Sequence, residues 1–202
     1  MINTQSQDIV VHDGAPGIKH LRAIGRFVVE FNKLDQYIIA LISILLGDEP
    51  ELGGIIANSW QGWQRFAALQ NIFAYRLGFA NKIRSGIDIK KDPKYVQLNK
   101  LFESLRKVND LRNQIVHSDW SGDFSDRSQA HRLKWKRNAV PGWSDFDYKL
   151  EDIHEMNSRI VFIEKTSKDL GNFVSENFYD YLALRAKQLR ESNKKSHPSE
   201  RY

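Results

Sequence analysis

Four long stretches of the chain carry apolar residues at the spacing of an α-helix. In the first, Leu21, Phe27, Leu34 and Leu45 belong to a set that recurs every three or four residues and so shares one helix face. The pattern predicts long helices from the turn at residues 13–16 to residue 47 and over 61–77, 93–117 and 151–190, with a shorter helix over 51–58. Residues 81–92 break the period and are expected to form a connection.

A different pattern separates the third long stretch from the fourth. Residues 118–130 are rich in Ser, Asp and Gly and have no helical period, so we expect a loop there. Residues 131–137 and 146–150 alternate apolar and polar positions, and a turn-like Val-Pro-Gly lies between them. We therefore predict a small β-hairpin insertion within 131–150, which packs Leu133 and Trp135 inward and turns its basic residues outward.

Together these elements predict an all-α protein, an up-and-down helical bundle of about four long helices with the hairpin inserted between the third and the fourth. At 202 residues the chain is long enough for one domain with a substantial core. We assign residues 1–190 to that helical domain. Residues 191–202 are expected to form a basic, disordered tail.

Composition narrows the classes of protein that the chain can belong to. It contains no cysteine, which excludes disulfides, thiolate metal sites and a thiol nucleophile. The first residues lack the basic-then-apolar order of a secretory signal, and the apolar run at residues 37–46 is too short to span a bilayer. We expect a soluble, cytoplasmic protein without a membrane partner. The net charge of +5 is concentrated after residue 184, so the rest of the chain is nearly neutral.

The third long helix carries an arginine where a packing helix would carry an apolar side chain. On a wheel of about 100° per residue, Arg112 falls near the middle of the apolar stripe. Asn109 lies inside one edge of that stripe, while Asn113 and His117 stack just outside the same edge and Arg106 joins them. A guanidinium in this position is costly unless it is paired or lines a cleft.

Two interpretations of Arg112 follow. In the structural one, a carboxylate from another helix, such as Glu30 or Asp35, pairs with Arg112, and His117 is a helix C-terminal residue favoured by the helix dipole. In the functional one, the arginine fork binds a phosphate and the histidine transfers a proton near neutral pH. Two facing copies would supply an acid, a base and a phosphate clamp, enough to cleave RNA without a metal through its own 2′-hydroxyl.

The segment Arg112-Asn113-Gln114-Ile115-Val116-His117 resembles the motif of the HEPN superfamily, in which Arg, a polar residue and, a few residues later, His lie near the end of a late bundle helix. The following Ser-Asp-Trp also resembles the continuation seen in many members. The resemblance implies a single HEPN-like helical domain and a metal-independent endoribonuclease without cofactors. Arg112, Asn113 and His117 would be its catalytic residues, and Arg106 and Asn109 would help to bind RNA.

The same resemblance implies partners. Ribonuclease members bring two motifs together in a homodimer, and they include toxins of toxin–antitoxin pairs and other defence nucleases, so we expect a homodimer and an antitoxin or regulatory protein. Other members have lost activity. The alternative function is therefore a non-catalytic helical module that binds a partner protein, a nucleotide or RNA.

Two further charged segments suggest other roles. Asp119, Asp123 and Asp126 follow His117, but their spacing does not match a calcium loop, and we favour a solvated loop over a metal site. The basic, aromatic segment 131–137 has the composition of a nucleic-acid contact. If its basic residues face outward, they would guide RNA toward the site; these are Arg132, Lys134 and Lys136.

Overall fold

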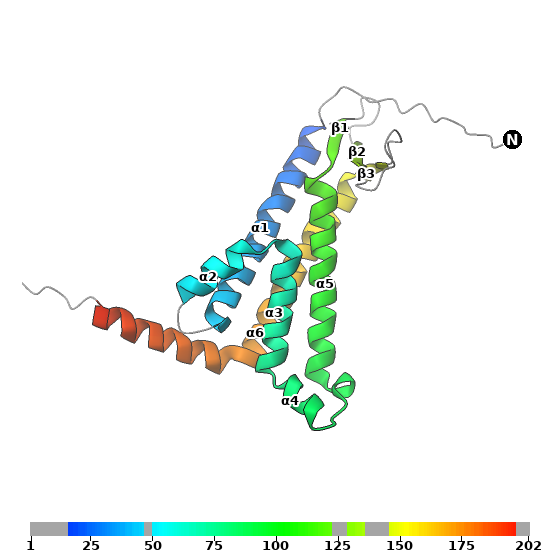
Figure 1. Cartoon of the computed structure of the whole chain (residues 1–202). Coiled ribbons are helices and arrows are strands. Elements are labelled where there is room, and N and C mark those ends of the chain that lie inside the picture. The colour runs from blue at the N-terminus through cyan, green and yellow to red at the C-terminus, as the bar shows by residue number, and fades with distance from the viewer. Residues whose placement is uncertain (1–15, 47–49, 123–128, 136–145, 197–202) are drawn as a thin grey trace, which may run out of the picture. The chain divides into compact units, whose positions relative to one another are not determined.

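The computed structural model describes residues 16–46, 50–122, 129–135 and 146–196, which are mostly helical (Figure 1). The element order is α1 (Ile18–Leu46), α2 (Pro50–Ser59), α3 (Gly62–Arg76), α4 (Phe79–Arg84), a 3-10 helix (Ile89–Lys91), α5 (Pro93–Val116), β1 (Asp119–Gly122), β2 (Gln129–Trp135), β3 (Phe146–Asp152) and α6 (Ile153–Ser196). The predominantly helical character is confirmed, whereas the up-and-down bundle stays a prediction.

Three segments differ from the sequence prediction. The expected loop at 118–130 contains β1 and the first residues of β2, because a strand of four residues is too short to show a period. The expected connection at 81–92 overlaps α4, which begins after Gly78 takes a left-handed conformation with φ of 74° and which buries Phe79. Finally, α6 continues to residue 196, so residues 191–196 are helical. The remainder of the predicted tail lies outside the described residues.

The strands form one antiparallel sheet in the order β1-β2-β3. The predicted hairpin is present as the β2–β3 pair, and β1 adds a third strand at its edge. Trp120 pairs with Arg132, which in turn pairs with Lys149, so these three side chains lie on one face of the sheet. Ala130 and Glu151 also form a pair, and both share that face because they lie two residues from Arg132 and Lys149.

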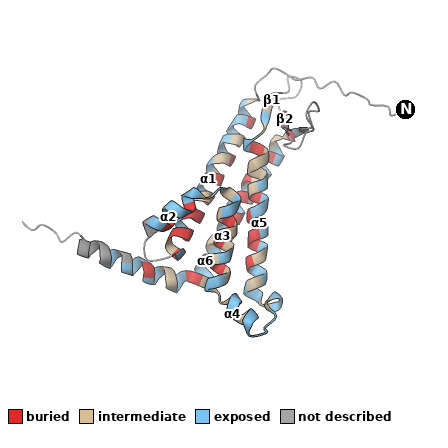
Figure 2. Cartoon of the chain, in the orientation of Figure 1, coloured by how far each residue is buried: buried red, intermediate tan, exposed pale blue. Residues whose placement is uncertain are grey.

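The described chain falls into two compact units, each composed of segments that are far apart in sequence. Unit 1 comprises residues 16–30 and the described residues from 110 to 162, including the sheet. Its core is contributed by three helices and β2; the buried residues are Ala23, Phe27, Ile115, Ala130, Met156 and Ile160. Figure 2 shows how buried and exposed residues alternate along the helices.

Unit 2 comprises residues 31–46, 50–109 and 163–196. Its core centres on Phe73 of α3, whose ring lies 4.8 Å from that of Phe178 and 5.4 Å from that of Phe173 between centroids. The ring of Phe102 from α5 meets Phe73 edge-on at 6.1 Å. The Phe178 pair is stacked, the Phe173 pair is tilted and the Phe102 pair is edge-on, and stacked and edge-on pairs are favoured aromatic geometries. Among the described residues, no helix is both long and apolar enough to cross a membrane.

A close backbone approach joins α2 to α1 within unit 2. Gly53 is buried against the backbone of Ser43, and a Cβ placed on it would lie 2.8 Å from both the Cα and the carbonyl oxygen of that residue. The neighbouring Gly54 has ordinary room, because its Cβ would lie 3.5 Å from the Ser43 hydroxyl oxygen. Only the first of these two glycines is therefore required by packing.

Gly53→Ala is expected to lower the free energy of unfolding by about 1–3 kcal/mol, because the added methyl forces the two helices apart. Gly54→Ala is the matched control and should be neutral or stabilising by up to about 1 kcal/mol, since alanine favours a helix interior over glycine. Urea denaturation of both variants measures the difference. Equal stability of the two variants would contradict the close approach.

Candidate functional site

The end of α5 brings together the three residues that the motif singles out. Nη1 of Arg112 donates to the side-chain oxygen of Asn113 at 3.1 Å and contacts Nε2 of His117 at 2.6 Å. Arg112 and Asn113 are half-buried, whereas His117 is exposed. The cluster therefore has one wall packed against the protein and one side open to a ligand.

The contact between Arg112 and His117 fixes the protonation of the ring. A guanidinium only donates hydrogen bonds, so Nε2 of His117 must accept, and an accepting nitrogen carries no proton. A hydrogen bond of this kind requires a neutral imidazole with its proton on Nδ1. The ring is thus in the form that a general base requires, while its lone pair is directed at the arginine.

This contact depends on where the helix ends. Residues five apart on a continuous α-helix point about 140° away from each other, so Arg112 and His117 would not share a face. The helix stops at Val116 and His117 lies in the turn that follows, which allows the ring to fold back toward the guanidinium. The helical wheel alone misses this contact because it assumes that the helix continues.

Two side chains after the motif bond to the last carbonyl groups of α5. The Ser118 hydroxyl donates to the carbonyl oxygen of Gln114, and the indole N–H of Trp120 donates to that of Ile115 at 2.9 Å. The final carbonyls of a helix have no partner within it and need such donors. The HEPN resemblance includes this Ser-Asp-Trp segment but implies no role for Ser118 or Trp120.

The other predicted RNA-binding residues of α5 make separate contacts within unit 2. Arg106 is exposed and donates to the side chain of Gln70 at 3.0 Å. Asn109 is half-buried beside Gly62, whose Cβ would lie 3.1 Å from the Asn109 side-chain oxygen. Their contribution to RNA binding stays a prediction.

The predicted orientation of the hairpin is wrong for Arg132. This residue is only 3% exposed and forms an ion pair with Glu151, with 2.8 Å between Nε and Oε1. The alternating pattern separates the two faces of the strand. The face with charged residues can be the buried one when a residue of opposite charge pairs with them. Leu133 is half-buried on the other face and Lys134 is half-buried, while Lys136 lies outside the described residues.

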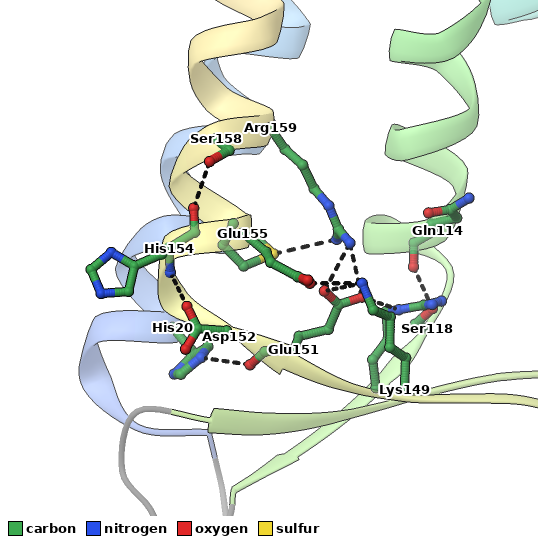
Figure 3. Close-up of polar contacts among 12 residues, drawn as sticks. His20, Gln114, Ser118, Lys149, Glu151, Asp152, His154, Glu155, Ser158 and Arg159 are labelled. Atoms are coloured by element: carbon green, nitrogen blue, oxygen red, sulfur yellow. Dashed lines mark hydrogen bonds and ion pairs between the residues drawn. The ribbon is translucent and has the colours of Figure 1, made fainter.

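Glu151 is the centre of a polar cluster in unit 1 (Figure 3). Its carboxylate is fully buried and accepts from Arg132 of β2 and from Arg159 of α6, the latter at 2.8 and 3.1 Å. Nζ of Lys149 lies 3.5 Å from Oε2 of Glu151. The backbone carbonyl oxygen of Glu151 contacts Nε2 of His20 from α1 at 3.2 Å. Burial raises the pKa of this carboxyl, but the hydrogen bonds and positive charges outweigh burial and leave the pKa below its ordinary value.

Asp35 and Glu30 are the two carboxylates predicted as structural partners of Arg112. Asp35 forms an ion pair with Arg65 of α3, within unit 2. The pairing of Glu30 with Arg112 stays a hypothesis. Among the described residues, no three His, Asp or Glu side chains lie close enough together to hold a metal ion. Asp119 is exposed, and Asp123 and Asp126 lie outside the described part of the chain.

Comparison with protein-family models, curated proteins and solved structures finds no match to this chain. The assignment of a function therefore rests on the residues themselves and on the geometry at the end of α5.

Replacement of Glu151 is expected to weaken the fold of unit 1. Glu151→Gln leaves Arg132 and Arg159 in place without the charge that compensates them, and breaking a buried pair in this way costs about 3–5 kcal/mol. Lys149→Ala is the control, because this lysine, whose side chain is 41% exposed, should contribute less than about 1 kcal/mol. Chemical denaturation compares them, and a loss below 1 kcal/mol for Glu151→Gln would contradict the role of the cluster.

The lowered pKa of Glu151 also predicts how stability depends on pH. A carboxyl whose folded pKa lies below its unfolded value stabilises the fold above the unfolded pKa, ordinarily 4.5, and loses that contribution as the pH falls through the folded pKa. The wild type should therefore lose stability below about pH 5 more steeply than Glu151→Gln. Denaturation midpoints between pH 7 and pH 3 measure the two slopes, and parallel slopes would contradict the prediction.

Proposed function

We propose that the protein is a metal-independent endoribonuclease of the HEPN type, with Arg112, Asn113 and His117 as its catalytic residues. The observation that carries the proposal is the 2.6 Å contact between the Arg112 guanidinium and Nε2 of a neutral, exposed His117. A permanent cation and an unprotonated base lie side by side, which is the pair of groups that transesterification of RNA requires.

The mechanism begins with an exchange of hydrogen-bond partners. A phosphodiester is a better acceptor for a guanidinium than a neutral imidazole, since it is charged and offers two oxygens to the fork. When Arg112 turns to the phosphate, Nε2 of His117 is released. It then takes the proton from the ribose 2′-hydroxyl as that oxygen attacks phosphorus, which forms a 2′,3′-cyclic phosphate.

The remaining groups complete the reaction. Arg112 neutralises the charge that builds on the phosphate oxygens, and the Asn113 side-chain oxygen holds the guanidinium close to the ring. The 5′-oxygen leaves with a proton that one histidine cannot supply while it acts as the base. We assign that proton to the histidine of a second copy in a homodimer, an arrangement that the HEPN resemblance implies; released from its own arginine, that ring takes up a proton from water and donates it as an imidazolium. Toxin or defence activity, held in check by an antitoxin, belongs to the same proposal.

A non-catalytic binding module is the second candidate. It is favoured by the fact that Arg112 is already hydrogen-bonded within its own segment, by Asn113 and His117, as a purely structural arginine would be. The two candidates predict different effects of substitutions of these residues on the stability of the fold. A catalytic histidine at an exposed site contributes little to folding, whereas a structural network loses stability when one member is removed.

Arg112→Ala and His117→Ala should each lower the rate of RNA cleavage in EDTA by roughly a hundredfold or more, the usual contribution of an acid–base or charge-stabilising group. Their melting temperatures should stay close to that of the wild type. The assay uses a mixed RNA pool and gel analysis of the products. Arg84→Ala and His154→Ala are matched controls at exposed positions on other helices and should leave the rate unchanged.

The outcomes separate the two candidates. Loss of cleavage in folded variants supports the ribonuclease. Retention of the wild-type rate by His117→Ala would contradict it. Absence of cleavage by the wild type, together with a loss of about 1–3 kcal/mol of stability in both variants, would favour the binding module.

A further inference from the structure

The segment that follows His117 departs from the helix and enters the sheet directly. β1 begins at Asp119, two residues after His117, and its second residue is Trp120. The Trp120 indole reaches back to the carbonyl oxygen of Ile115, the penultimate residue of α5, at 2.9 Å. His117 thus lies in the segment from Ile115 to Trp120, and this hydrogen bond joins the two ends of that segment.

The other end of the loop is anchored by the sheet. Trp120 pairs with Arg132 on β2, and both side chains lie on the face that the helices of unit 1 cover. Arg132 in turn forms an ion pair with the buried carboxylate of Glu151. The indole is held by its own hydrogen bond, and the strand that carries it pairs with β2, which the Arg132–Glu151 ion pair anchors.

This anchoring bears on the catalytic contact because the contact requires a particular break in the helix. Arg112 and His117 meet only when the chain leaves the helical path after Val116. Ser118 and Trp120 satisfy the carbonyls of Gln114 and Ile115, which stabilises the chain at that point of departure. A free helix end would fray or continue, and either change would carry the ring away from the guanidinium.

We propose that Trp120 is a positioning residue that holds His117 opposite Arg112, and that the sheet inserted between α5 and α6 serves to fix this residue. The inference rests on the proposed ribonuclease function and extends it to a residue outside the motif. Ser118 supports the same geometry through its bond to Gln114.

Trp120→Phe tests the inference because it removes the N–H donor and keeps an aromatic ring. We expect kcat to fall roughly ten- to a hundredfold, the effect of a displaced catalytic group, with KM close to that of the wild type. Trp63→Phe is the matched control at an exposed tryptophan of α3 and should leave kcat unchanged. Ser118→Ala should lower kcat in the same direction, whereas Ser104→Ala removes an equivalent hydroxyl-to-carbonyl bond, of 3.2 Å, in the middle of α5 and should not.

A second readout does not depend on catalysis. Nitrogen NMR of the histidine rings distinguishes an accepting Nε2 with the proton on Nδ1 from a ring that exchanges freely between tautomers. The wild type should show the first pattern for His117 and the second for the exposed His154. In Trp120→Phe the signals of His117 should move toward those of His154.

The two readouts keep the failure of this inference distinct from failure of the proposed function. If the wild type does not cleave RNA, the ring signals still decide whether Trp120 positions His117. Unchanged His117 signals in Trp120→Phe overturn the inference, as does an unchanged kcat in an active enzyme. If Trp120→Phe does not fold, Ser118→Ala is measured for kcat and for the His117 ring signals. If both measurements equal those of Ser104→Ala, the inference is overturned.

Discussion

The organisation of unit 1 depends on one buried carboxylate. Glu151 is removed from water, which is tolerable only because Arg132 and Arg159 supply hydrogen bonds and charge at close range. These partners belong to β2 and α6, and His20 of α1 contacts the backbone of the same residue. Residues of β2, α6 and the distant α1 must therefore meet at Glu151. Once β2 is held there, β1 and its Trp120 are held beside it.

The chemistry at the end of α5 follows from that framework. Arg112 can only donate and a neutral ring of His117 can accept, and the two side chains are in contact without a ligand. The same contact occupies the lone pair that a base would use. In the proposed mechanism, an anionic ligand that attracts the guanidinium would release the base, so that binding of a phosphodiester would activate the histidine. The resting contact and the reactive state are thus two arrangements of one set of donors and acceptors.

The sequence predicts the long helices because each is long enough to show its period, and it predicts the β2–β3 hairpin from alternation, but it misses α4, which has six residues. It does not predict β1, which has four residues, or the burial of Arg132, because alternation separates two faces without indicating which is covered. The motif identifies Arg112 and His117, but the wheel places them apart. Their contact arises from the end of the helix, which depends on Ser118 and Trp120 and on the tertiary framework behind them. Such long-range constraints leave no local pattern.

The most direct test of the central claim is the chemical nature of the ends that the protein leaves on a cleaved RNA in EDTA. Attack by the ribose 2′-hydroxyl predicts a 2′,3′-cyclic phosphate on one fragment and a 5′-hydroxyl on the other, and a single 2′-deoxy substitution at the cleaved position should abolish the reaction. Fragments with 5′-phosphate and 3′-hydroxyl ends, or cleavage that survives the 2′-deoxy substitution, would contradict a mechanism in which His117 takes the proton of the 2′-hydroxyl.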